Sequence, residues 1–460
     1  MGLNFTGMTL AQLAPLNGGN YAPPDTMGAV GNSHIVQFVN GGFRIFDKST
    51  GAGVVSALTP GGAPITDTAF WSASGATNVN SLSDPRVIFD RSSQRWIAAQ
   101  ITTNESVGNR VLVARSNTAD PTAGWISTSF VPTTTNFADF PTLSLNADGI
   151  FIGTNNFTSS TGSFTNVSLI GIPKADILAA TPTVANRTVI SGTTSTIGFT
   201  PQAALDFGVS TGRNAVYGVS TNTTLRRVNV ANLLTPPGSL SGSAAITVAS
   251  ASTSTNYSLQ PDGTVQLDNG DNRISGNVVK IGDRVYMVRA VGAGARSAIR
   301  ITVLSESTDA VLAETTISDT NRDYMYPSIS ANSAGDIVIG FSRSGSAAGE
   351  FAGSYGRTGS FNGTTFTLDS GDTLLKAGTA NYHLFGGTGE RFGDYSATVS
   401  DPNDPNSFWT FQEFAAGATN WGTQITNIRV GAVSVPEPGT GSLLVYVAFS
   451  VACFVVRRKR

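Results

Sequence analysis

The sequence predicts an all-β chain, folded as an about seven-bladed β-propeller and followed by a single C-terminal transmembrane helix. Three observations lead to this prediction: a strand–turn–strand unit recurs, long helical periodicity is absent, and an apolar run precedes four terminal cations. Stacking such units around an axis buries amphipathic strands that no unit could bury alone. The expected organisation is an N-terminal segment (1–20), a propeller (21–430), a linker (431–439), a transmembrane helix (440–456) and a basic cytoplasmic tail (457–460).

Composition agrees with a turn-rich β-protein. Only 13% of the 460 residues are charged, and 51 are glycine. The formal net charge is −2 and the last four residues supply +4, so residues 1–456 carry −6. This balance argues against a nucleic-acid partner, whose phosphates need a basic face.

Cysteine and histidine limit the chemistry. The single cysteine, Cys453, lies in the C-terminal apolar run, so the body of the protein can form no internal disulfide. The two histidines, His34 and His383, are too few for a histidine metal cluster.

The N-terminal segment has two expected features. Residues 3–5 form a short strand that would close a ring of blades by joining the last one. The first fifteen residues lack both a basic stretch and a continuous apolar core, so they are not a secretory signal. We expect such a signal to lie upstream of Met1.

The repeated unit is an apolar strand, often preceded by Asp or Pro, then a tight polar turn and a second apolar strand. The seven copies begin at Ala29, Asp84, Asp139, Ala204, Ser275, Tyr326 and Gly393. Copies three and six align almost residue for residue. They recur about every 50–70 residues, somewhat more than the spacing typical of propeller blades. Two sandwiches or a β-helix are the alternatives.

Three segments, 23–51, 84–101 and 391–414, resemble a recurrent group of bacterial secreted propellers. The resemblance covers most of residues 20–430. It implies the fold and little else, because propellers serve many functions.

Acidic residues near the start of the repeats are the candidate site. We expect them to precede the innermost strands and to surround one mouth of a central channel, where a Ca²⁺ ion or a cationic ligand would offset their repulsion. The alternative is that each carboxylate caps a turn. The candidates are Asp25, Asp84, Asp139, Asp206, Asp323 and Asp394.

The second interpretation is an enzyme, a sialidase-like glycan hydrolase or lyase that acts at the channel face. A glycan hydrolase needs two carboxylates that flank the sugar bond. Propeller sialidases use three arginines, a Tyr–Glu pair and an acid. This chain is similar to them in that it contains arginines, tyrosines and an aspartate that could take these places. The residues in question are Arg86, Arg115, Arg322, Arg391, Asp323, Tyr324 and Tyr326. The Asp-box turns of that family do not occur.

The C-terminal tail has three parts. The first is the tetrad Val435, Pro436, Glu437 and Pro438, the second is an apolar run, and the third is Arg457, Arg458, Lys459 and Arg460. Counted from Thr440, the run just reaches the roughly 17 residues that a spanning helix needs. The cations should remain cytoplasmic, which places the body outside.

This tripartite tail resembles the PEP-CTERM sorting signal of bacterial surface proteins. The resemblance implies that an exosortase cuts near Pro-Glu-Pro and removes the helix. We therefore expect an exported cell-surface or extracellular-matrix protein that is transiently anchored in the inner membrane. Its expected partners are an exosortase and exopolysaccharide or other surface components.

Overall fold

Antiparallel strands make up most of the described chain, as the composition predicted. The computed structural model describes residues 1–208, 214–232, 238–250, 252, 257–387 and 389–431. In this part of the chain the α-helices are short: α1 (Leu10–Asn17), α2 (Asp67–Ala73) and α3 (Lys174–Leu178). None of its helices has the length and apolar character needed to cross a membrane. The tetrad at 435–438, the predicted helix at 440–456 and the cations at 457–460 lie outside the described residues.

The strands form seven consecutive groups within the described residues. The first three groups are β2 (Met27–Val30), β3 (His34–Val39) and β4 (Gly42–Asp47); β5 (Leu82–Asp90), β6 (Arg95–Thr102), β7 (Val111–Ser116) and β8 (Trp125–Phe130); and β9 (Phe137–Asp139), β10 (Ser144–Leu145), β11 (Gly149–Phe157), β12 (Phe164–Pro173) and β13 (Thr188–Gly192). The next two are β14 (Phe199–Leu205), β15 (Ala215–Thr221), β16 (Thr224–Ala231) and β17 (Ser239–Thr247); and β20 (Val278–Ile281), β21 (Arg284–Ala293), β22 (Arg296–Ser305) and β23 (Val311–Ile317).

The sixth group is β24 (Arg322–Ala331), β25 (Asp336–Gly345), β26 (Gly353–Phe361), β27 (Phe366–Leu368) and β28 (Thr373–Lys376). The seventh is β30 (Ala397–Ser400), β31 (Ser407–Gly417), β32 (Asn420–Arg429) and β1 (Asn4–Thr9). A small sheet of β18 (Tyr257–Ser258), β19 (Gln266–Asp268) and β29 (Gly389–Glu390) joins segments that are far apart in the sequence.

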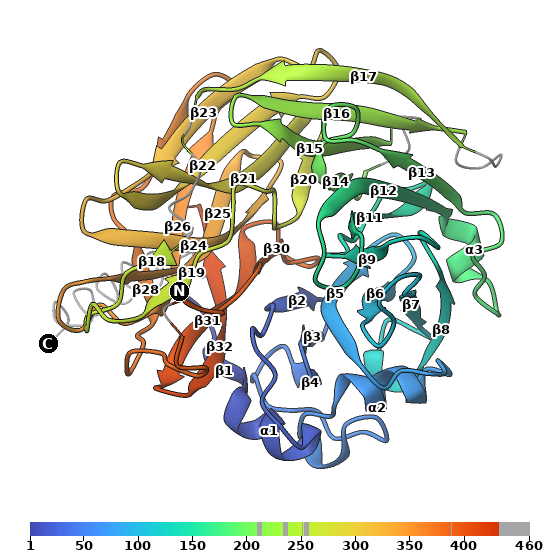
Figure 1. The fold of residues 1–460 in the computed structure, drawn as a ribbon, viewed down its shortest axis with the longest axis horizontal. Helices are drawn as coiled ribbons and strands as arrows, with labels where there is room; N and C mark the ends of the chain where they lie inside the picture. Colours follow the sequence, from blue (N-terminus) through green and yellow to red (C-terminus); the bar gives the residue numbers. More distant parts are fainter. Residues whose placement is uncertain (209–213, 233–237, 251, 253–256, 388, 432–460) are drawn as a thin grey trace, which may run out of the picture. The chain divides into compact units, whose positions relative to one another are not determined.

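The groups follow one another around a centre within residues 1–429 (Figure 1). Each begins with its innermost strand, which in the third group is divided into β9 and β10, both paired with β11. Innermost strands of different groups contact one another: β2 contacts β5, β10 contacts β14, β20 contacts β24, and β30 contacts both β24 and β2. The innermost strands β14 and β20 pair in parallel, which joins two groups into one sheet. The arrangement is propeller-like.

Strand β1 closes the seventh group. It pairs antiparallel with β32, with Asn4 opposite Thr426 and Phe5 opposite Ile425. The first strand of the chain therefore lies at the outer edge of the last group, where the sequence placed residues 3–5. Helix α1 follows at once, and Thr9 caps its N-terminus by accepting a hydrogen bond from the Gln12 backbone.

A residue with a positive φ followed by proline recurs near the start of four innermost strands. Asp84, Phe140, Thr200 and Tyr326 each have a φ between +50° and +60° and each precedes proline. A positive φ is uncommon in residues other than glycine. Its recurrence at equivalent positions therefore indicates that the fold needs a turn at this point of the strand. In three of the four strands a polar side chain follows the proline: Thr142, Gln202 and Ser328. In the fourth that residue is Arg86.

Candidate polar site where the innermost strands begin

Four of the six predicted acids lie near one another where the innermost strands begin: Asp25, Asp84, Asp139 and Asp394. Asp25 precedes β2 and is 1% exposed; burial raises its pKa well above the usual range, and Asp394 and Asp84 add to this. Burial likewise raises the pKa of Asp139 to about 7, again with a contribution from Asp84 and Asp394. These carboxyl groups therefore act on one another electrostatically.

The prediction was wrong for Asp206 and Asp323. Asp206 follows the innermost strand β14 instead of preceding it, so it lies at the opposite end, 2.8 Å from Lys280 Nζ. Asp323 begins β24 but its carboxylate accepts from the Ser297 backbone and pairs with Arg296 at 3.0 Å. Both act as structural anchors between neighbouring strands.

The turn-capping alternative applies to Asp84. Its Oδ2 accepts from the Phe140 backbone N–H at 3.0 Å and its Oδ1 accepts from the Ser83 hydroxyl at 2.7 Å. Asn40 reinforces this position, because its Oδ1 accepts from the Asp84 backbone while its Nδ2 donates to Asp25 Oδ2. Asn40 thus ties two of the acids together.

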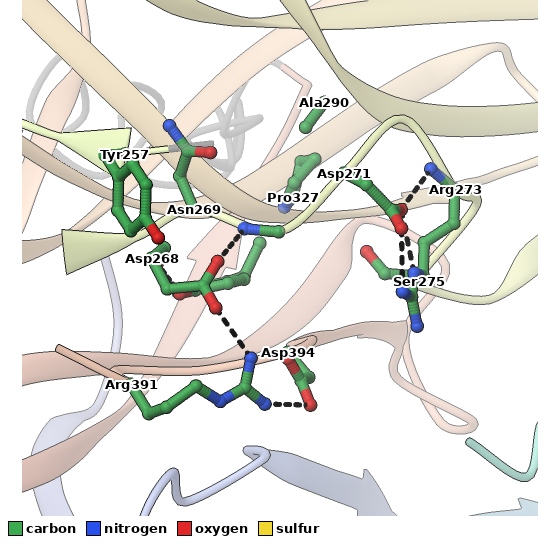
Figure 2. A pocket seen from close by; sticks show the side chains of 12 residues that line it. Tyr257, Asp268, Asn269, Asp271, Arg273, Ser275, Ala290, Pro327, Arg391 and Asp394 are labelled. Carbon is green, nitrogen blue, oxygen red and sulfur yellow. Dashed lines mark hydrogen bonds and ion pairs between the residues drawn. The ribbon is translucent and has the colours of Figure 1, made fainter. Parts of the chain in front are cut away.

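Arg391 bridges two carboxylates beside this group. Its Nη1 donates to Asp268 at 2.8 Å and its Nη2 donates to Asp394 at 2.6 Å (Figure 2). Partial desolvation lowers the pKa of Arg391, but the surrounding acids outweigh this and raise it above its ordinary value. The pairing of β19 with β29 brings Asp268 and Arg391 together across 123 positions of sequence. A charge-assisted chain of this kind fixes all three side chains.

Arg273 forms the second pair, with Asp271. Its Nε and Nη2 both donate to the Asp271 carboxylate at 2.7 Å, a bidentate contact that Figure 2 shows at the side of the cavity. The guanidinium also lies 4.4 Å from the Phe140 ring centroid. Arg273, Asp268 and Asp271 were not among the predicted residues, since all three lie in the irregular segment around β19, which carries no repeat pattern.

Arg86 crosses the centre from β5. Its Nε donates to the Pro141 carbonyl at 2.9 Å and its Nη1 donates to the Ser275 carbonyl at 3.1 Å. The side chain is fully buried, and Nη2 has no hydrogen-bond partner among the described residues. Tyr395 covers one face of the guanidinium and donates its own hydroxyl to the Pro85 carbonyl.

Glu413 and Tyr326 complete the site. Glu413 on β31 is fully buried and accepts from the Thr26 hydroxyl at 2.8 Å; burial raises its pKa well above the usual range. Burial also raises the pKa of Tyr326, whose hydroxyl donates to the Asp268 carbonyl. Glu413 was not among the candidates predicted from the sequence; a carboxylate within the strand-like run 408–414 is the signal that could have identified it.

Part of this site lines a cavity of about 280 Å³; Asp394 is the member of the four clustered acids that borders it. Tyr257, Asp268, Asp271, Arg273, Arg391 and Asp394 are among the residues that line it, and Figure 2 shows them around the opening. Tyr257 is 47% exposed, so its ring is accessible at the rim. The cavity offers carboxylate acceptors, guanidinium donors and one aromatic surface to a ligand.

The residues do not support a calcium site. Among the described residues, no group of three or more Asp, Glu, His or Cys side chains is arranged to hold a metal ion. Arginines supply the positive charge instead, through Arg391 on Asp394 and Arg273 on Asp271. Oxygen ligands already neutralised in this way are poor partners for Ca²⁺.

The arginines and tyrosines named in the enzyme interpretation do not form one set. Arg86, Arg391 and Tyr326 belong to the site. Arg115 instead donates to the Ala179 carbonyl, Arg322 pairs with Glu350, and the Tyr324 hydroxyl donates to Asp372. The structure therefore places only part of the expected constellation at this cavity.

Comparison with known proteins adds little. No protein-family model matches the chain, and no curated protein does. A sialidase of Trypanosoma rangeli, solved with 2,3-difluorosialic acid, matches with a TM-score of 0.36 and 9% identity over 75% of this chain and 53% of that one. The chain thus spans about half the length of that sialidase.

Two further solved structures are similar at the same level. The N11 neuraminidase-like protein of a flat-faced bat influenza A virus matches with a TM-score of 0.33 and 11% identity over 65% of this chain and 76% of that one. The GH62 α-L-arabinofuranosidase domain of Coprinopsis cinerea matches with a TM-score of 0.31 and 12% identity over 64% and 90%. Such scores carry no functional argument.

Proposed function

We propose that this chain is an exported cell-surface or extracellular-matrix protein, a seven-bladed β-propeller that binds polysaccharide at the polar cavity. The observation that carries the proposal is the Asp268–Arg391–Asp394 chain at the wall of a cavity with an accessible aromatic rim. Sugar hydroxyl groups can donate hydrogen bonds to carboxylates and accept hydrogen bonds from guanidiniums, so a wall that contains both can bind them. An exposed tyrosine ring suits the apolar face of a pyranose.

The proposal predicts binding without turnover. Affinity electrophoresis of the full chain through gels that contain surface polysaccharide should show retardation. Asp268→Asn and Tyr257→Ala should abolish most of it, because the first breaks the carboxylate–guanidinium chain and the second removes the aromatic rim.

Two matched controls test whether the effect is local. Asp404→Asn breaks a comparable pair, Asp404–Arg429 at 2.7 Å, and Phe164→Ala removes another aromatic side chain that is exposed, at 37%. Neither residue lines the polar cavity. Equal loss in the controls, or unchanged retardation in Asp268→Asn, would count against the cavity as the binding site.

A glycan hydrolase is the second candidate, and Asp139 is the observation that favours it. A carboxylic acid with a pKa of about 7 keeps its proton near neutral pH and can donate it to a glycosidic oxygen, while Asp84 lies close enough to raise that pKa. Release of reducing ends from the same polysaccharide, lost in Asp139→Asn, would establish hydrolysis. Absence of release from any surface glycan tested would exclude it for those substrates.

The sorting proposal rests on the sequence of the tail. An exosortase would recognise Pro436, Glu437 and Pro438, and the helix at 440–456 would hold the chain N-out and C-in until cleavage. In cells, Glu437→Ala should leave the tail uncleaved and the protein in the membrane fraction. A wild-type protein found in the cytosol would refute the assignment.

A further inference from the structure

A second cavity lies where the innermost strands end. Strand β5 contributes Arg86 to the polar site and then Ile88 to this cavity, and β24 likewise contributes Tyr326 first and Ala331 later. Its volume is about 300 Å³. Because the innermost strands run in the same direction, this cavity faces the opposite mouth from the polar one.

The walls of the second cavity are mostly apolar. Aliphatic side chains from six strand groups line it, namely Val30, Ile88, Leu205, Val279, Ala331 and Val399. The Phe207 ring adds an aromatic surface. This lining contrasts with the carboxylates and guanidiniums of the polar cavity. Transfer of an apolar ligand group from water into the second cavity is therefore favourable.

Both acids in the lining already have cationic partners. Asp206 lies 2.8 Å from Lys280 Nζ, and Asp401 lies 2.6 Å from Lys48 Nζ. Asp401 also accepts from the Trp409 indole at 2.9 Å. Ion pairs with lysines therefore offset the negative charge of both acids at the rim of the cavity.

Among the charged residues that line the cavity, Arg91 differs in having no ion-pair partner in the described part of the chain. It lies at the turn after β5, and its Nη2 donates to the carbonyl and the hydroxyl of Ser400, both at 2.7 Å. The guanidinium lies 4.6 Å from the Phe207 ring centroid. No carboxylate of the described residues forms an ion pair with it. Arg91 is thus held in place by hydrogen bonds to neutral groups, and Asp401 acts on it electrostatically without forming an ion pair.

We propose that this second cavity binds an amphipathic carboxylate, a molecule with a compact apolar body and one carboxylate group. The apolar body packs against the aliphatic walls, and the carboxylate accepts from Arg91. The site goes beyond the proposed polysaccharide site, because the two cavities share no lining residue.

Calorimetric titration of the full chain tests the proposal with octanoate and 1-octanol, which share an apolar body and differ in charge. We expect octanoate to bind at one site per chain and 1-octanol to bind at least about tenfold more weakly, the effect of losing one charge-assisted contact. Arg91→Gln should weaken octanoate by a similar factor and leave 1-octanol unchanged. Val399→Glu should abolish octanoate binding, because it places a negative charge on the wall.

Arg95→Gln is the matched control, since Arg95 flanks the same turn as Arg91 but does not line the cavity. Its octanoate affinity should equal that of the wild type. No saturable octanoate binding, equal affinity for octanoate and 1-octanol, or equal effects of Arg91→Gln and Arg95→Gln would each overturn the proposal. Polysaccharide binding by Arg91→Gln should remain normal, which separates this test from that of the polar cavity.

Discussion

The guanidinium carbon of Arg86 lies 3.4 Å from the centroid of the Tyr395 ring. The two residues come from the second and the seventh strand groups, and Arg86 also bonds to carbonyls that precede β10 and β20. One side chain therefore links four of the groups. Burial lowers the pKa of Arg86, while Tyr395, Asp84 and Asp25 oppose that effect.

Arg86→Met should destabilise the fold by about 2–4 kcal/mol. The substitution keeps an apolar chain over Tyr395 but leaves the Pro141 and Ser275 carbonyls without their charged donor. Urea unfolding measures the change. Arg429→Met is the control, because Arg429 is an exposed partner of Asp404 and should cost less than about 1 kcal/mol. Equal losses in both variants would show that Arg86 does not link the groups.

Closure of the ring by β1 gives a second prediction. A Cβ at Gly7 would lie 2.4 Å from Gln37 Oε1 and 2.7 Å from Thr423 Oγ1, so Gly7→Ala forces β1 away from its neighbours. We expect a loss of about 1–3 kcal/mol in the free energy of unfolding, typical of overpacking.

Gly19→Ala is the control for Gly7→Ala. A Cβ at Gly19 meets nothing within 4 Å, and its φ is not positive. The two variants can be compared by thermal unfolding. A Gly7→Ala protein as stable as Gly19→Ala would mean that β1 contributes little to closure.

The repeats were predictable because their turns are local. Asn146 Oδ1 accepts from the backbones of Asp148 and Gly149, and Asn332 Oδ1 accepts from that of Asp336. Such turns leave a signature within four or five residues. The predominance of strands follows from the same local signals.

The polar site was only partly predictable. Asp206 was misplaced because the innermost strand of its group, β14, precedes it, and no periodic pattern distinguished that strand from the next one. The Asp268–Arg391 pair depends on β19 and β29, strands of three and two residues whose parallel pairing leaves no pattern in the sequence. Glu413 and Arg86 were visible as charges within apolar strands, but only the fold shows that both face the centre.

Asn40 gives a third prediction. Its side chain donates to Asp25 Oδ2 and to the Pro23 carbonyl and accepts from the Asp84 backbone, so it holds the start of two innermost strands. Asn40→Ala should cost about 2–4 kcal/mol, because it leaves several buried polar groups unsatisfied. Asn136→Ala, at a partly exposed position where the side chain bonds to the hydroxyls of Thr135 and Thr165, should cost less than about 1 kcal/mol. Urea unfolding that gave similar values for both variants would contradict this role.

The pH dependence of stability provides the fourth prediction. Burial, with Asp84 and Asp394, raises the pKa of Asp139 to about 7, and the pKa values of Asp25 and Glu413 are raised in the same direction. Between the unfolded pKa near 4 and the folded value, the native state binds more protons than the unfolded state, so stability falls as pH rises. Asp139→Asn removes this contribution. Its stability relative to the wild type should therefore increase by about 1–3 kcal/mol between pH 5 and pH 8.

Asp47→Asn should behave in the opposite sense. Hydrogen bonds from the Ser49 and Thr50 side chains lower the pKa of Asp47, so its contribution is present above the unfolded pKa and is lost as pH falls through the lower folded value. At neutral pH the Asp47→Asn protein should be slightly less stable than the wild type, with a difference that shrinks towards acid pH. Urea unfolding at pH 3, 5 and 8 distinguishes the two variants. A difference between Asp139→Asn and wild type that is constant from pH 5 to pH 8 would show that Asp139 is ionised throughout, and that the acids around it do not share a protonated state.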